Sequence, residues 1–458
     1  MSVDTSARRV ITLIAGSGVV HLPGDPGFDS ARTSWNLAVD QRPAAVAEPR
    51  TTRDVAAAVR SARRAGLRVA AQSTGHNAGP LAAQDLSDVM IVRTGALDGV
   101  SIDPERRVAR VGGGSIWAPV VAAAGAHGLA ALHGSSPDVG VAGYSLGGGL
   151  GWYARQLGMQ ANSLTAVVMV TTDGDLIRAD QHENSDLFWA LRGAGGNFGV
   201  VTALEFRLHP IDSTYAGWLV WDVARAIEVL ERYEEWAAQA PDEVTTSFRI
   251  LNVPPLPQIP EPLRGRSLVV IDGAVLGSDE RGSEILRALR ALRPEIDTFG
   301  RLPAPALARL HMDPVGPTPS VGSSAVLGQL GRAGIDAFVE RAGVGPHSGL
   351  ITAELRQLGG AVGRPAIDGG ALSHLEGHYA FMSVGVAATP ERTAASHAAT
   401  HGLVDALRPW STRQNYLGFA ESRVPAGTAF DEDRLDLLRA VRAAYDPDDV
   451  MVANHRLD

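Results

Sequence analysis

Apolar and polar positions divide the first 207 residues into short strands and helices. Residues 52–64 place Val55, Ala58, Val59 and Ala62 on one helical face and open on a threonine, which predicts a capped helix. A second helix is predicted at 118–126. Runs rich in β-branched residues predict strands at 67–71, 89–92, 100–102, 107–111, 167–170 and 200–202. Glycine-rich junctions separate these elements, and the pattern predicts an α+β fold.

The pattern changes beyond Pro210. Helices are predicted at 224–239, 282–292 and 432–444, and strands at 248–251 and 268–271. The proline-rich residues 303–319 are predicted to form a loop. A chain of 458 residues suits two or three compact domains.

Composition excludes several kinds of chemistry. The chain has no cysteine, which excludes disulfides, thiolate zinc sites, iron–sulfur ligation and cysteine nucleophiles. It also has no lysine, which excludes Schiff-base catalysis and the lysine of a phosphate-binding P-loop. The net charge is −9 and no basic run occurs, so we expect no nucleic-acid partner.

The chain shows no segment suited to a membrane. No run approaches the ~20 apolar residues that a spanning helix needs. Arg8 and Arg9 precede an apolar stretch that ends at Val20, a pattern shared by some export signals. Because that stretch contains glycines and no small-residue cleavage site follows, we predict that residues 7–20 form the first element of the fold and that the protein is cytoplasmic.

Three glycine-rich segments, 71–79, 134–151 and 193–201, each lie next to a predicted strand. Glycines beside Ser, Thr and Asn leave backbone N–H groups free to approach a diphosphate. One such segment is as consistent with tight turns, but three in one domain favour a large anionic cofactor. The spaced glycine fingerprint of nicotinamide dinucleotide sites is absent.

The motifs resemble those of FAD-linked oxidases of the vanillyl-alcohol-oxidase superfamily, in the branch of berberine bridge enzyme and hydroxynicotine oxidase. The resemblance follows the whole chain in order. Its pieces are Trp35-Asn36, Ser73-Thr74-Gly75-His76, Ser136–Gly143 leading into Gly147-Gly148-Gly149, Asn184–Gly193, Gly195–Val201, His311–Pro314, Glu354–Ala361, Tyr445-Asp446-Pro447 and Asn454.

The resemblance implies FAD joined to the ring of His76 through the flavin 8-methyl carbon. Many relatives form a second bond through a cysteine where this chain has Ser136, so we expect single attachment. Val139 occupies a position beside the flavin at which valine tends to admit oxygen, although it is also a plausible core residue. The expected cofactor-binding residues are Gln72, Ser73, Thr74, Gly75, His76, Asn77, Ala78, Ser136, Val139, Gly140, Gly143, Gly149, Gly199, Val201, Asn415 and Asn454.

The substrate side departs from the family. Many relatives carry Tyr-x-Asn-Phe over the flavin, and we align it with Arg413-Gln414-Asn415-Tyr416, which puts arginine at the tyrosine position. Arginine does not deprotonate in proteins, so any base is another group, with Tyr416 and Tyr144 as candidates, unless the substrate needs none. Arg413 is then an anion-binding residue or part of a structural ion pair. His374 and His378 are four residues apart but lack a third ligand, so no metal site is expected.

We therefore predict an α+β protein with a PCMH-type FAD-binding domain of two subdomains, residues 1–207 completed by 411–458. A substrate-binding domain, residues 208–410, is expected to form an antiparallel sheet covered by helices. The implied reaction is hydride transfer from a small molecule to flavin N5, with reoxidation by oxygen to hydrogen peroxide. The alternatives are an enzyme that tailors a natural product by oxidative cyclisation or oxygenation, and a flavin-binding protein without turnover.

Overall fold

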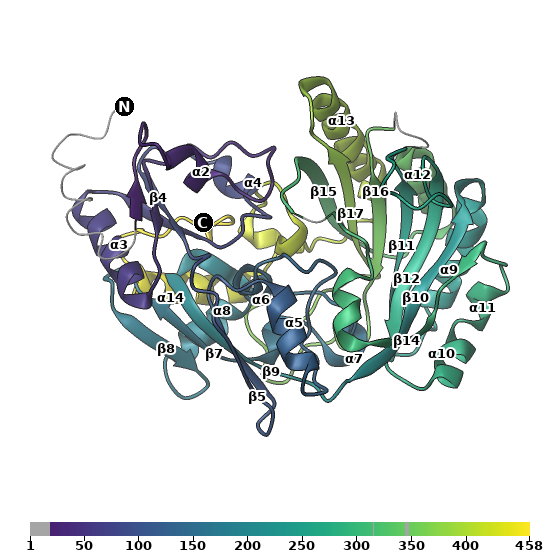
Figure 1. Cartoon of the computed structure of the whole chain (residues 1–458), viewed down its shortest axis with the longest axis horizontal. Helices are drawn as coiled ribbons and strands as arrows, with labels where there is room; N and C mark the ends of the chain where they lie inside the picture. Colours follow the sequence, from purple (N-terminus) through teal and green to yellow (C-terminus); the bar gives the residue numbers. More distant parts are fainter. Residues whose placement is uncertain (1–18, 315, 344–347) are drawn as a thin grey trace.

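The computed structural model describes residues 19–314, 316–343 and 348–458. Within these ranges the strands form three sheets, of four, five and eight strands. Figure 1 shows the first two sheets in the left half of the molecule and the third in the right half. The predicted first element, residues 7–20, lies outside the described residues except for Val19 and Val20, which begin β1 (Val19–His21).

The four-stranded sheet has the order β1-β2-β4-β3, with β2 (Ala45–Glu48), β4 (Val89–Arg93) and β3 (Arg68–Gln72) parallel. The predicted helix at 52–64 is confirmed as α3 (Thr52–Arg64). The Thr51 side chain accepts a hydrogen bond from the Asp54 amide, and the Asp54 carboxylate accepts one from the Thr51 amide, which satisfies donors at the helix start. β3 then leads directly into residues 73–79, the remainder of the first glycine-rich segment.

The five-stranded sheet is antiparallel and has the order β5-β6-β9-β7-β8. Its strands are β5 (Val100–Asp103), β6 (Val108–Gly112), β9 (Val200–Arg207), β7 (Leu164–Val170) and β8 (Leu176–Asp180). The helices of this half are α2 (Phe28–Arg32), α4 (Gly79–Ala82), α5 (Trp117–Gly125), α6 (Val141–Leu146), α7 (Ala154–Leu157), α8 (Ser185–Ala194) and α14 (Glu432–Tyr445).

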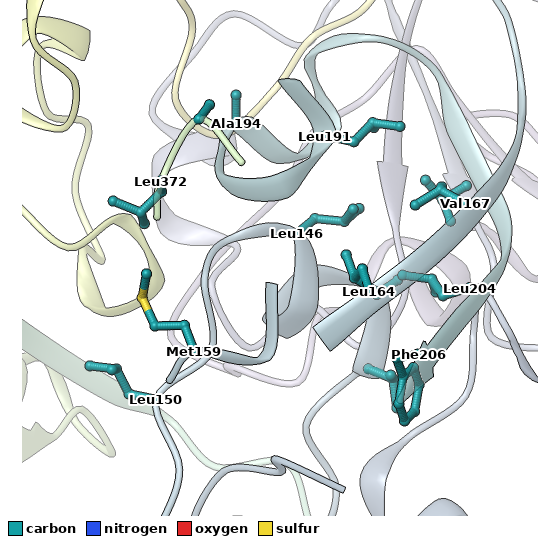
Figure 2. Packing of buried hydrophobic residues seen from close by; sticks show 14 of the residues in the cluster. Leu146, Leu150, Met159, Leu164, Val167, Leu191, Ala194, Leu204, Phe206 and Leu372 are labelled. Carbon is teal, nitrogen blue, oxygen red and sulfur yellow. The ribbon is translucent and has the colours of Figure 1, made fainter. Parts of the chain in front are cut away.

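The largest apolar core joins this sheet to α6 and α8. Figure 2 shows Leu146 of α6 and Leu191 of α8 directed toward the core that also holds Val167 and Leu204 of the sheet. Leu372, in the segment that connects two strands of the third sheet, lies in the same cluster. The C-terminal helix α14 adds Leu435, Leu438 and Val441, so the end of the chain packs onto its first half.

The third sheet is antiparallel throughout. Its order is β13-β10-β12-β11-β16-β17-β15, with β14 beside β10. The strands are β10 (Ser213–Asp222), β11 (Val244–Asn252), β12 (Ser267–Val275), β13 (Ile296–Asp297), β14 (Gly300–Pro303), β15 (Ser320–Leu327), β16 (Thr352–Gln357) and β17 (Tyr379–Val386).

One face of the third sheet is apolar and covered by helices. Phe248 of β11 and Phe381 of β17 pack with Phe338 of α12. The helices are α9 (Ala226–Ala237), α10 (Asp279–Ile285), α11 (Arg287–Arg290), α12 (Gly331–Ala342) and α13 (Pro390–Leu407). The opposite face turns toward the first half of the molecule. The predicted α+β class and the helix-covered antiparallel sheet are confirmed.

Some local predictions were wrong. The helix predicted at 282–292 is two helices that meet at Leu286, and the loop predicted at 303–319 contains the 3-10 helix Ala304–Arg309. β8 and α8 were not predicted. β8 is a five-residue strand at a sheet edge with two charged residues, and α8 is a ten-residue helix. None of the helices in the described ranges has the length and apolar character needed to cross a bilayer.

Candidate functional site

His76 is held by contacts on three sides. Its ring stacks on Trp35, with centroids 4.0 Å apart and an interplanar angle of 18°. Nδ1 is hydrogen-bonded to the Thr74 hydroxyl at 2.8 Å. Nε2 lies 3.4 Å from Asp138 Oδ1 but makes no hydrogen bond, although it is buried. The imidazole therefore has a fixed plane and one ring nitrogen without a hydrogen-bond partner among the described residues.

Asp138 is the acidic partner of this histidine and had no role assigned from the sequence. Its carboxylate accepts hydrogen bonds from Trp35 Nε1 at 2.7 Å and from the Ser136 hydroxyl at 2.9 Å. Burial alone would raise the pKa of Asp138, but the interactions with His76, Trp35 and Ser136 outweigh it and hold this pKa far below its usual range. A fixed negative charge therefore lies beside the imidazole at neutral pH.

The glycine-rich segments come close together around His76. Gly75 has φ +81°, and a Cβ there would lie 2.8 Å from Ser34 Cβ, so only glycine fits. A Cβ at Gly140 would lie 2.3 Å from the Ser73 hydroxyl oxygen. Gly143, by contrast, is exposed, and an added Cβ would meet nothing within 4 Å. The loops at 73–76 and 136–140 are therefore in close contact at Gly140. Gly143, which follows the second loop, leaves its backbone accessible.

The other expected cofactor-binding residues surround this junction. The Gln72 side chain is bonded to Gln41 and Arg93, which leaves its backbone rather than its amide group for a ligand. Asn77 is bonded through its amide nitrogen to the Leu417 carbonyl, and its own carbonyl accepts from Asn454. Ala78 and Val201 are buried, and Val139 is half-buried against the main core. Gly149 has φ +81°, and a Cβ on Gly199 would clash with the Met169 side chain. The backbone amide of Asn415 donates a hydrogen bond to the Thr428 carbonyl.

The three candidate catalytic residues lie in different environments. Tyr416 is buried, and its hydroxyl accepts a 2.9 Å hydrogen bond from the Gly149 amide. Tyr144 is enclosed by Trp117, Gly134 and Gly149, and its hydroxyl has no hydrogen-bond partner among the residues that the structure describes. Burial raises the pKa of Tyr416 to about 12 and that of Tyr144 well above its usual value, so both are protonated at neutral pH.

Arg413 is exposed, and no hydrogen bond or ion pair of its side chain is found within the described ranges. The structural ion pair left open above is therefore not formed with any of these residues. His374 is buried and bonded to Ser373, whereas His378 is exposed, and they do not share a helix. Among the described residues no group of three or more acidic or histidine side chains is arranged to hold a metal.

A cluster of five buried ionisable side chains covers the inward face of the third sheet. We call it the roof cluster: Arg249, Asp272, His311, Glu354 and Arg356. None of these side chains is more than 6% exposed. Arg249 and Asp272 lie on β11 and β12, and Glu354 and Arg356 on β16. His311 and Glu354 belong to motif pieces noted above, but the sequence alone did not connect them.

The roof cluster is an alternating chain of charges. His311 donates from Nδ1 to Asp272 at 2.9 Å and from Nε2 to Glu354 at 3.2 Å, and Arg356 Nε donates to Glu354 at 2.8 Å. Burial and the Arg249 charge oppose protonation of His311, but the two carboxylates outweigh them and raise its pKa to about 9. The same contacts hold the pKa of Glu354 well below its usual range despite its burial.

The roof cluster faces the loops of the first half. The Arg356 guanidinium lies 5.7 Å from the Trp152 ring centroid and 5.3 Å from that of Phe419, and it contacts the Ser135 hydroxyl at 3.4 Å. Ser135 is adjacent to Ser136, which bonds Asp138 beside His76. The two halves of the molecule therefore meet at a site that combines a fixed histidine, bare glycine backbone and buried charge.

These residues fit a flavin dinucleotide. Nε2 of His76 is buried without a hydrogen-bond partner in the described ranges, the glycines allow backbone approach, and Gly143 faces open space. A family model for the FAD binding domain matches residues 43–180. (R)-6-hydroxynicotine oxidase of Paenarthrobacter nicotinovorans is 30% identical over 408 residues, covering 88% of this chain and 82% of the relative. Glucooligosaccharide oxidase of Sarocladium strictum is 33% identical over 243 residues, 52% of this chain and 48% of the relative.

Solved structures share the fold. The BBE-like 1 protein of Physcomitrella patens superposes with a TM-score of 0.84 at 21% identity, covering 99% of both chains. 6-hydroxy-D-nicotine oxidase of Arthrobacter nicotinovorans gives a TM-score of 0.82 at 24% identity, covering 96% of this chain and 98% of that one. The fold of the chain is therefore that of PCMH-type FAD-binding proteins.

Proposed function

Since the chain belongs to the family of FAD-linked oxidases that includes (R)-6-hydroxynicotine oxidase, we propose that it oxidises a small organic molecule with FAD bonded once, to His76. It is an FAD-linked oxidoreductase. When bound, FAD would supply the acceptor for the substrate hydride, and its reoxidation by oxygen would yield hydrogen peroxide. The chain's own residues attach and orient the cofactor, cover the substrate and handle protons.

The contacts around His76 are the main support for a covalent bond between this residue and the flavin. A nucleophilic imidazole nitrogen must be unprotonated and must keep its ring plane fixed. Stacking on Trp35 fixes the plane, and the Thr74 hydroxyl and Asp138 carboxylate lie at the two ring nitrogens. The Asp138 carboxylate stabilises the positive charge that develops on the imidazole ring as one of its nitrogens forms the bond. Asp138 therefore assists attachment.

Ser136 supports a single bond. Its hydroxyl donates to Asp138 rather than lying free, and a serine hydroxyl is a far weaker nucleophile than the cysteine of many relatives. Ser136 instead helps to keep Asp138 ionised. Val139 follows in the same loop and is only partly buried, which supports its proposed role of admitting oxygen beside the flavin.

On the substrate side we propose that Tyr416 takes the place first assigned to Arg413. The residues Tyr416-Leu417-Gly418-Phe419 also spell the family pattern, with glycine in place of asparagine, and they lie three positions later. Tyr416 reaches the Gly149 backbone and Phe419 lies over Arg356, whereas Arg413 points away into solvent. Because Tyr416 is protonated at neutral pH, it is a hydrogen-bond donor to substrate rather than the base.

Attachment is tested by acid precipitation of the purified protein. We expect the yellow colour to stay with the wild-type pellet and to move to the supernatant in His76→Ala, while His182→Ala, an exposed histidine, behaves as wild type. Turnover is tested by peroxide release with racemic 6-hydroxynicotine and with glucooligosaccharides, the compounds named for relatives. Free FAD released by the wild type would refute attachment. Retained colour without peroxide or flavin bleaching by any substrate would favour a flavin-binding protein without turnover.

A further inference from the structure

The segment from Tyr416 to Glu421 crosses the boundary between the two halves of the molecule. Tyr416 bonds the Gly149 amide, and the carbonyl of Leu417 accepts from Asn77 beside His76. At the far end, a Cβ on Gly79 would lie 2.4 Å from the Glu421 carbonyl oxygen. Glu421 is thus placed between the loop that carries His76 and the third sheet.

The Glu421 carboxyl group lies on the same face of the third sheet as the roof cluster. A Cβ on Gly322 of β15 would be 2.8 Å from Glu421 Oε1, so the carboxyl rests on that glycine. Cross-strand partners share a face, and residues two apart on a strand do as well. Gly322 pairs with Val384, and the neighbouring row on that face runs through Ser324, Met382 and Glu354. The carboxyl therefore faces the region beneath the sheet, not the helices above it.

Unlike Asp138, Asp272 and Glu354, Glu421 has no cationic partner among the described residues. Asp138 is held by His76, Trp35 and Ser136, Asp272 by Arg249 and His311, and Glu354 by His311 and Arg356. Glu421 makes no ion pair with any residue of the described ranges, and the Gly322 amide is the group that bonds its carboxylate.

Burial raises the pKa of Glu421 to about 7. Both protonation states are therefore populated near neutral pH, as effective proton transfer requires. Tyr416 and Tyr144 remain protonated there, and Glu354 remains ionised within its charge chain. Arg413 is exposed and always charged. Of the acidic and phenolic groups named at this site, Glu421 is the one free to take up a proton.

We propose that Glu421 is the proton acceptor in substrate oxidation, an inference that rests on the oxidase function proposed above. The substrate C–H bond breaks and its hydrogen leaves with both electrons to the oxidised flavin. The O–H or N–H bond of the heteroatom attached to that carbon breaks, and its electron pair forms the second bond of the C=O or C=N product. The released proton adds to the Glu421 carboxylate and then passes to water.

The test compares Glu421→Gln with Glu421→Asp and with Glu376→Gln, an exposed glutamate near the same site. Anaerobic flavin reduction by 6-hydroxynicotine and by a glucooligosaccharide is followed from acid to alkaline pH. In the wild type and in Glu376→Gln the rate should rise through about pH 7. Glu421→Gln should lose this rise and fall by about 10²–10⁴-fold at the plateau, the usual contribution of a general base. Glu421→Asp, which keeps a carboxyl, should retain the rise at a lower rate.

Infrared difference titration provides a readout that does not depend on turnover. A buried carboxyl band should titrate near pH 7 in wild-type protein and vanish in Glu421→Gln. A folded Glu421→Gln that binds flavin and keeps the wild-type rate and pH profile would overturn the proposal. If neither probe reduces the wild-type flavin, the oxidase function fails on its own. The infrared titration then still decides, because a Glu421 carboxyl that titrates in the ordinary range of exposed glutamates would contradict an isolated acid–base group.

Discussion

Replacing His311 with asparagine should remove most of the pH dependence of stability that the roof cluster creates. The pKa of His311 is about 9 in the folded state, against an ordinary value of 6.5. Each tenfold change in proton affinity is worth ~1.4 kcal/mol. Protonation of His311 in the roof cluster therefore adds about 3 kcal/mol to the free energy of unfolding. Because this pKa is raised, the contribution is complete below pH 6.5 and is lost as the pH rises through 9. The free energy of unfolding of wild type minus that of His311→Asn should therefore shrink by about 3 kcal/mol between about pH 6 and about pH 9.5.

Urea unfolding followed by tryptophan fluorescence measures this difference, because Trp152 lies 5.7 Å from the His311 ring and Trp218 lies 5.2 Å from the Arg249 guanidinium. His182→Asn, in which an exposed histidine is changed, should track the wild type across the same pH range. A constant difference between wild type and His311→Asn would refute the reasoning. It would mean that His311 is not protonated between the two carboxylates.

Two further predictions concern the cofactor site. Asp138→Asn keeps the shape of the side chain but removes the charge beside His76, so the fraction of FAD retained after acid precipitation should fall several-fold while total bound FAD falls less. Tyr416→Phe leaves the buried Gly149 amide without its acceptor, which should lower the free energy of unfolding by about 1–3 kcal/mol in urea titration. A Tyr416→Phe protein as stable as the wild type would show that this hydrogen bond does not contribute to the free energy of unfolding.

Local sequence patterns predicted an element correctly where its start signal and its buried face both lie within the element. The helix Thr52–Arg64 has an N-cap, a capping box and an apolar face within fourteen residues. Its bounds were predicted correctly. The strands β4 and β12 are buried on both faces and appear as continuous apolar runs, so their presence was also predicted. β8 and α8 were missed because a polar edge strand and a short motif helix lack such a signal.

Site prediction from sequence succeeded for the parts that lie in one segment. His76, Thr74 and Gly75 belong to a single loop, and their contacts are local. The register of the segment at 413–421 could not be decided in this way, because Arg413 and Tyr416 each fit one alignment of the pattern. The structure separates them by burial, with Tyr416 inside and Arg413 in solvent.

The sequence by itself determined the α+β elements, the glycine loops and, through the order of its motifs, the FAD-linked family. It could not indicate that His311 lies between Asp272 and Glu354, which are 39 and 43 residues away, or that Glu421 rests on Gly322. Those contacts depend on cross-strand register and on how the two halves meet. Only the tertiary structure decided them, and with them which carboxyl groups are paired and which is left free, because protonation at this site depends on burial and on the charges that the fold brings near.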